Sequence, residues 1–176
     1  MNVIAALVAA GLWAGAQHPT MPAGMSHEEH RREMDKDAAL KKRGADAMGF
    51  DQDATVHHFR LSATGGSIEV DVRRAADDAQ RAQIRAHLQQ LAGDFAQGDF
   101  GRPATTHAEV PPGVAGMQAH RDAISYRYEE RPLGARVLIE TRDPDALKAV
   151  QAFLRYQIAE HKTGDASAPK KGSAHD

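Results

Sequence analysis

The sequence predicts an α+β fold: a two-layer sandwich from a duplicated ββα unit, in which a four-stranded, mostly antiparallel sheet carries two helices on one face. A helical arm rich in methionine and histidine precedes the sandwich. Several short segments alternate apolar with polar residues, as half-buried strands do. Longer segments place apolar residues three or four positions apart, as amphipathic helices do. The order strand, turn, strand, helix occurs twice, which indicates the duplication.

Residues 1–16 predict a signal peptide. The run NVIAALVAAGLWAGA is uncharged and apolar, and it ends in Ala14-Gly15-Ala16, the small-x-small pattern that precedes a signal-peptidase cut. An uncleaved anchor helix is the alternative, but the run is shorter than the roughly 20 residues that a bilayer span needs. We therefore expect a periplasmic or secreted mature chain, with no membrane attachment after cleavage.

Residues 17–47 predict a helical arm. Ser26 followed by Glu29 fits the capping box, in which each side chain bonds the backbone amide of the other residue. A helix is therefore expected to begin at Ser26. Glu28 and Arg32 stand four positions apart and add a solvated ion pair. The segment lacks an apolar stripe, so this helix is marginal on its own.

Soft metal ligands are concentrated in the arm. His27, His30 and Met34 are spaced by three and four residues, which places them on one side of a helix, and Met21 and Met25 precede them. Imidazole and thioether groups together suit copper, above all Cu(I), when no thiolate is present. The alternative is a solvated arm whose methionines only dock onto the domain.

Residues 48–162 predict the sandwich itself. In the first strand, His57 and Phe59 alternate with polar neighbours, and the second half repeats this pattern when Ile68 is set against Val137. The helices follow each pair of strands. Their apolar stripes contain Ile84, Leu88, Leu91 and Phe95 in the first half, and Leu147, Val150, Leu154 and Ile158 in the second.

The alignment of the two halves reveals an asymmetry in ring type. It sets His57 against Tyr126 and His87 against Phe153. Imidazole is a poorer packing group than the aromatic rings of the second half, so a further use of these histidines would explain them. The alternative is a structural role, with neutral rings that fill aromatic positions and form hydrogen bonds.

Five residues of the domain are candidate metal ligands. We expect His57 and His87 to face the core and to converge under the helices with Met48 or His120. His58 follows His57 directly, so it lies on the opposite face of the strand and is a candidate ligand there. Haem held without a covalent link by histidine or methionine is a second expectation for such residues.

About thirty residues connect the two halves, which is long for a link without structure. Pro111-Pro112-Gly113 predicts a turn, residues 114–121 predict a short helix, and residues 106–110 predict a brief edge strand. After the last helix, residues 163–176 are small, polar and charged, as a disordered tail is.

Composition narrows the classes of function. The chain has no cysteine, so disulfides, thiolate metal sites and covalent haem attachment are excluded. The 22 basic and 24 acidic residues are interleaved, which gives no electrostatic attraction for nucleic acid. No nucleophile elbow or phosphate-binding loop is present, which favours a non-enzymatic role. A hydrolase based on the sheet carboxylates Glu69, Asp71 and Glu140 is the enzymatic alternative.

Several stretches resemble a family of small exported bacterial proteins. They are MSHEEH, KKRGADAMGFDQDATVHHF with its M-G-F-D-Q-D-x-T-x-H-H-F pattern, IRAHLQQLAGDFAQGDF, PPG and FLRYQIAEHKTGD. Members are sometimes labelled aspartate carbamoyltransferase. This sequence does not support that label, because it is too short for such a catalytic chain and lacks the Ser-Thr-Arg-Thr phosphate-binding stretch. The resemblance implies export and a shared fold. It does not imply any particular activity.

The sequence therefore predicts an exported, non-enzymatic metal-binding protein. Copper is the expected ion, captured by the arm and held or passed on by the domain. The alternative is a periplasmic interaction module with structural histidines, whose open sheet face or PPGVAGMQAH loop docks another exported protein.

Overall fold

The computed structural model describes residues 25–169. The predicted signal peptide, Met21 and the end of the predicted tail lie outside the described residues. Within the described part, no helix is long and apolar enough to cross a membrane. The chain divides at Asp35 into two compact units, and the second, Lys36–Asp176, contains the sandwich.

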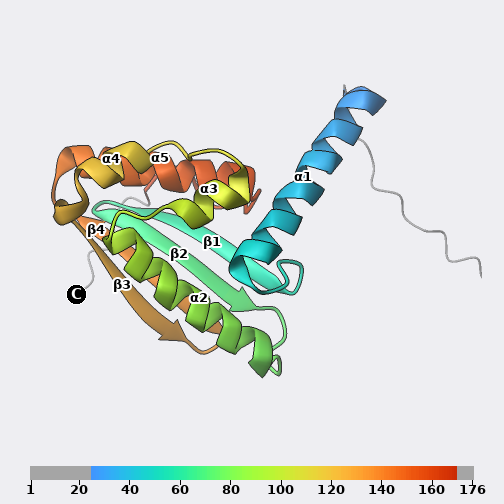
Figure 1. Ribbon diagram of the computed structural model, residues 1–176, viewed down its shortest axis with the longest axis horizontal. Helices are drawn as coiled ribbons and strands as arrows, with labels where there is room; N and C mark the ends of the chain where they lie inside the picture. The colour runs from blue at the N-terminus through green and yellow to red at the C-terminus, as the bar shows by residue number, and fades with distance from the viewer. Residues whose placement is uncertain (1–24, 170–176) are drawn as a thin grey trace, which may run out of the picture. The chain divides into compact units, whose positions relative to one another are not determined.

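The observed architecture is an α+β sandwich, which confirms the predicted fold class (Figure 1). The sheet has four strands in the order β1-β2-β4-β3, and every neighbouring pair is antiparallel. The elements are α1 (His27–Met48), β1 (Thr55–Ser62), β2 (Gly65–Val72), α2 (Asp78–Ala96), α3 (Gly101–His107), α4 (Val114–Ala119), the 3₁₀ turn η1 (Arg121–Ala123), β3 (Ile124–Arg131), β4 (Gly134–Thr141) and α5 (Pro144–Glu160).

The strand register agrees with the predicted duplication. Phe59 pairs with Ile68 in the first hairpin, and Tyr128 pairs with Val137 in the second. Ile68 and Val137 then pair with each other where β2 meets β4. The two hairpins are thus built with the same register and meet at equivalent residues in the centre of the sheet.

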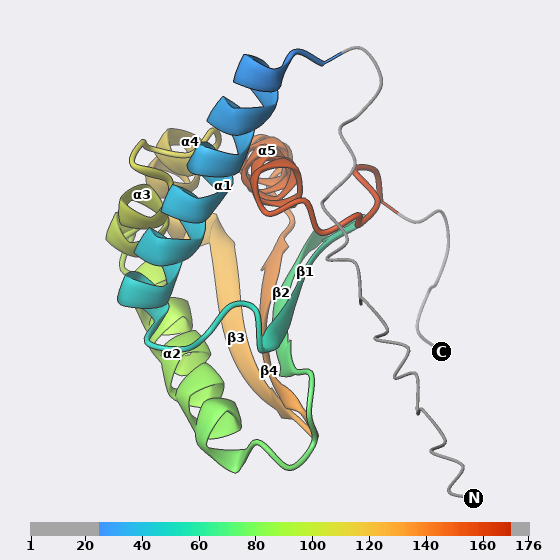
Figure 2. The same ribbon diagram turned by 90° about the vertical axis from the view of Figure 1, so that its right-hand side faces the viewer.

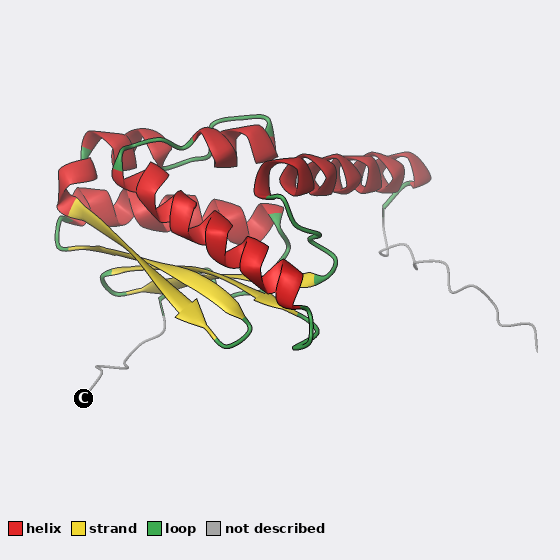
Figure 3. Cartoon of the chain, turned by 60° about the horizontal axis from the view of Figure 1, so that its bottom comes forward, coloured by secondary structure: helices red, strands yellow, loops and turns green. Residues whose placement is uncertain are grey.

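Helices α2 and α5 cover the same face of the sheet (Figures 2 and 3). Each helix packs mainly on the hairpin of the other half, because α2 contacts β3 and β4 most and α5 contacts β1 and β2 most. The core between the layers is apolar. Its largest fully buried side chains include Phe95, Phe153, Ile84, Leu88, Met117 and Ile139.

The opposite face of the sheet carries charged pairs across strands. Arg60 Nε lies 3.3 Å from Glu69 Oε2, and Arg131 Nη2 lies 2.9 Å from Asp71 Oδ2. Arg131 also pairs with Glu69. The contact of Arg60 joins the neighbouring strands β1 and β2, whereas Arg131 on β3 reaches past β4 to its partners on β2. These contacts engage Glu69 and Asp71, two of the three carboxylates that a hydrolase on this face would need.

The link between the halves is helical. Thr106 and His107 end α3 and a turn follows, so the predicted edge strand at residues 106–110 is wrong. The short helix predicted at residues 114–121 is present as α4, continued by η1. Gly113 before α4 has φ 89°, and a Cβ there would lie 2.2 Å from the Ala149 carbonyl oxygen. Only glycine allows this close approach to α5.

The start of α1 has the predicted capping box. Ser26 N donates to Glu29 Oε2 at 2.9 Å, and Glu29 N donates to Ser26 Oγ at 3.2 Å. Residues 36–48 belong to the second compact unit. There Leu40 is buried, and Arg43 Nε donates to the carbonyl oxygen of Thr106 at 2.9 Å. The last turns of α1 are therefore attached to the end of α3.

The segment after α5 contacts the edge of β1. Asp165 Oδ2 accepts a hydrogen bond from Phe59 N at 2.9 Å, and Asp165 Oδ1 lies 3.0 Å from His58 Nδ1. The Asp165 side chain is nearly buried. The first residues of the predicted tail, 163–169, thus include an anchor on the sheet.

Candidate functional site

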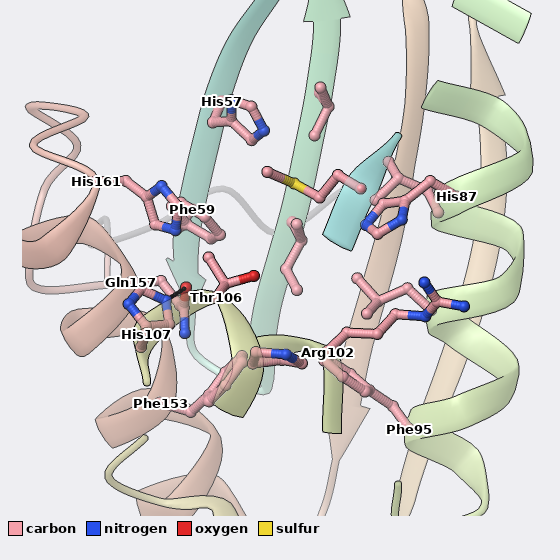
Figure 4. Close-up of a pocket in the computed structure, with 16 residues that line it drawn as sticks. His57, Phe59, His87, Phe95, Arg102, Thr106, His107, Phe153, Gln157 and His161 are labelled. Atoms are coloured by element: carbon pink, nitrogen blue, oxygen red, sulfur yellow. Dashed lines mark hydrogen bonds between the residues drawn. The ribbon is translucent and has the colours of Figure 1, made fainter. Parts of the chain in front are cut away.

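A cavity of about 60 Å³ lies between the sheet and the helices (Figure 4). Core side chains such as Phe59, Leu91 and Phe153 form much of its wall. A second set of lining residues brings nitrogen, oxygen and sulfur atoms to an otherwise apolar space. This set contains Met48, His57, His87, His107, Gln157 and His161.

These six residues come from five elements of the fold. Met48 is the last residue of α1, His57 lies on the inner face of β1, and His87 lies on the buried face of α2. His107 ends α3, and Gln157 and His161 lie on α5 and at its C-cap. Figure 4 shows His57 and His161 on one wall and His87 on the opposite wall.

Aromatic contacts hold the imidazole rings in place. The His57 and His161 rings are nearly parallel, with centroids 5.9 Å apart, and the His107 ring meets His161 edge-on at 5.1 Å. Phe50 stacks against His57 at 5.9 Å, and Phe59 lies 5.3 Å from His161. These rings therefore pack as aromatic side chains do.

Three buried polar atoms of the described residues have no protein partner at this cavity. His107 Nε2 lies 2.9 Å from Gln157 Oε1, which can only accept, so His107 donates and its Nδ1 carries a lone pair. His107 Nδ1, Gln157 Nε2 and His57 Nε2 are all buried without a hydrogen bond. Each such atom costs about 1–3 kcal/mol unless something else satisfies it. The cavity therefore offers unmet bonding capacity to water or to a ligand.

The cavity histidines are uncharged at neutral pH. Burial lowers the pKa of His57 and of His87 to about 4, helped for His57 by the nearby His87 and for His87 by Arg102. Burial and the neighbouring His57 and His107 lower the pKa of His161 to about 3. Burial also lowers the pKa of His107, and this effect outweighs the hydrogen bond that His107 donates to Gln157, which raises the pKa. His57 and His161 are partly exposed as whole residues, but His57 Nε2 is fully buried, and this atom decides its chemistry.

We compared the chain with protein-family models, with curated proteins and with solved structures. No match was found. The function is therefore argued from the cavity and its residues.

The donor geometry limits the kinds of metal site. Among the described residues, no three His, Asp or Glu side chains are grouped so that they can hold one ion. A preformed site with three imidazoles, as in many zinc enzymes, is therefore absent from the described part.

The cavity is too small for haem. Its volume of about 60 Å³ is well below the roughly 150 Å³ of a cavity that takes up benzene. Haem is much larger than benzene, so the expected haem site does not fit these residues as they are packed.

Three of the predicted domain ligands line this cavity together: Met48, His57 and His87. The expected convergence of His120 with them is wrong. His120 Nδ1 lies 3.7 Å from Asp143 Oδ1, its side chain is 38% exposed, and it does not line the cavity.

His58 has the predicted position on the other face of β1. It pairs there with Asp165, so its nitrogen is engaged by the chain itself. A metal ion that leaves this contact intact would have to bind His58 through Nε2.

The described ligands of the arm lie in the first compact unit. His27, His30 and Met34 belong to the first turns of α1, and Met25 precedes them. Met34 is 51% exposed, and His27 is also exposed. These side chains are accessible to an ion from solution.

Sequence reasoning missed His107, Gln157 and His161. The sequence predicts an edge strand at His107, although this residue ends a helix. The sequence does contain a pattern that points to His161. Leu154, Ile158 and His161 are spaced by four and three residues, so they lie on the same face of the helix. A search of helical stripes beyond the last apolar residue finds it.

Proposed function

We propose that this chain is an exported copper-binding protein whose domain holds the ion in the cavity between sheet and helices. The observation that carries the proposal is the buried, unpartnered His57 Nε2 in a cavity that Met48 and His161 also line. Thioether sulfur is a soft donor that suits copper, and imidazole nitrogen suits copper as it suits zinc, iron and nickel. No aspartate or glutamate of the described residues lines the cavity, as calcium or magnesium would need.

The arm has the role of first capture in this proposal. His27 and Met34 are exposed on α1, and His30 lies between them at helical spacing. Exposed ligands exchange an ion quickly with solution, whereas the cavity holds it away from water. The ion therefore passes from the accessible ligands to the enclosed ones.

The test is a copper titration of the chain beginning at Gln17 against a competing chelator. Wild type is compared with His57→Ala and with His58→Ala, a control at the next residue but on the opposite face of β1. The proposal predicts that His57→Ala weakens binding by about tenfold or more and that His58→Ala does not. A variant with His27, His30 and Met34 changed to alanine should load more slowly but keep the tight site.

An interaction module with structural histidines is the second candidate. Four aromatic rings form a continuous row of contacts, and this packing needs no ion. The row is Phe50, His57, His161 and Phe59. Copper binding no tighter than that of a histidine-poor control protein would reject the copper proposal and leave the module as the better interpretation.

A further inference from the structure

The wall of the cavity has no negative charge among the described residues. Its uncharged donors are imidazoles, an amide, a hydroxyl and a thioether. Arg102 is the other ionisable lining residue, and its Nε lies 2.9 Å from Asp94 Oδ2. Asp94 itself does not line the cavity. An ion that enters therefore meets no carboxylate to offset its charge.

This charge balance discriminates between ions by valence. The cost of moving an ion from water into a low-dielectric interior rises with the square of its charge, so a divalent ion pays about four times the cost of a monovalent one. Protein sites for divalent ions commonly include carboxylates or thiolates, which return part of that cost. Neutral donors return less of it, so a divalent ion needs more of them, as in zinc sites with three imidazoles.

Coordination number discriminates in the same direction. Zn(II) takes four ligands and Cu(II) prefers square-planar or tetragonal sites. Cu(I), with a filled d shell, is stable with two or three soft neutral ligands. The described chain brings no three His, Asp or Glu together here, whereas His57, His161 and Met48 line one cavity and supply the two imidazoles and one thioether that Cu(I) would need.

We infer that the cavity binds copper as Cu(I) and rejects Cu(II) and Zn(II). The inference rests on the proposed function, since it specifies the ion of the same site. The inference concerns only the oxidation state of the bound copper. Copper reaches the cavity as Cu(I), so the protein carries out no reduction.

The first experiment compares ions on the same protein. Ligands of the arm would bind the ions themselves, so in the chain beginning at Gln17 the arm ligands are changed to alanine, namely His18, Met21, Met25, His27, His30 and Met34. Dissociation constants are measured by chelator competition for Cu(I), without oxygen and with ascorbate, and for Zn(II) and Cu(II). We expect Cu(I) to bind about a thousandfold more tightly than Zn(II). Zn(II) or Cu(II) within about tenfold of Cu(I) would overturn the inference.

A second experiment adds the missing charge. Gln157→Glu is nearly isosteric and places a carboxylate beside His107, inside the cavity. We expect Zn(II) binding to tighten by about tenfold or more, with a smaller change for Cu(I). Gln151→Glu is the matched control, because it adds the same charge to α5 at a residue that does not line the cavity.

The outcomes separate this inference from the proposed function. If neither Cu(I) nor Zn(II) binds tightly, the proposed function fails. If both bind with similar affinity and His57→Ala weakens both, the proposed function stands and the selectivity for Cu(I) is refuted. If Gln157→Glu does not fold, as a melting curve would show, the comparison of ions on the parent protein still decides.

Discussion

Acidification from pH 7 to pH 5 is expected to destabilise the domain by about 6 kcal/mol, because the cavity keeps His57, His87 and His161 uncharged. These rings lie under the helices, where a proton on any of them has no carboxylate beside it in the cavity wall. Protonation is therefore far easier in the unfolded chain than in the folded one.

The magnitude follows from the pKa values. In the folded chain the pKa is about 4 for His57 and for His87 and about 3 for His161, against about 6.5 for an exposed imidazole. At a pH between the folded and the unfolded pKa, the unfolded chain binds more protons than the folded chain. The contribution of these histidines to stability is therefore fully present above about pH 6.5 and is lost as the pH falls toward the folded pKa. At pH 5 each histidine accounts for about 2 kcal/mol. The sum is similar to the roughly 5–15 kcal/mol that stabilises a typical domain.

The assay is urea unfolding at pH 7, 6 and 5, followed by far-ultraviolet circular dichroism. Carboxyl groups titrate mainly below this range, so the loss reports the histidines. His87→Phe is the matched variant, since Phe153 has the equivalent place in the other half, and it should reduce the loss by about a third. A free energy of unfolding that changes by less than about 1 kcal/mol between pH 7 and pH 5 would refute this reasoning.

Three further predictions concern the backbone. Ala108 caps α3 with φ 57°, so Ala108→Gly should raise the free energy of unfolding by about 0.5–1 kcal/mol in urea titrations, and a loss of stability would contradict the strained cap. Gly113→Ala should lower the free energy of unfolding by more than about 2 kcal/mol, because the new Cβ would lie 2.2 Å from the Ala149 carbonyl oxygen. An unchanged urea midpoint would show that α4 shifts freely. Asp165→Ala should speed hydrogen exchange at the Phe59 amide and leave amides in α2 unchanged, and equal exchange in both proteins would mean that Asp165 does not anchor the segment after α5.

The strands and helices were predictable because their signals are local. Phe59 and Ile68 alternate with polar neighbours whatever the rest of the chain does, and the stripe through Leu88 is contained in one helix. The strand order was not predictable. It depends on the pairing of Ile68 with Val137, and no local pattern records which strands become neighbours.

The candidate site was predictable only in part, for a related reason. His57 and His87 were found because each interrupts an apolar pattern on its own element. His107 and His161 reach the cavity through the packing of α3 and the end of α5, which depends on contacts distant in sequence. A seven-residue helix such as α3 also has too few turns to show a stripe.

The most direct test of the account is nuclear magnetic resonance of the imidazole nitrogens while one equivalent of Cu(I) is added without oxygen. If His57 Nε2 ligates the ion, its nitrogen signal shifts strongly while those of His58 stay in place. Signals of His57 that remain unchanged while only those of His27 and His30 respond would contradict a copper site in the cavity.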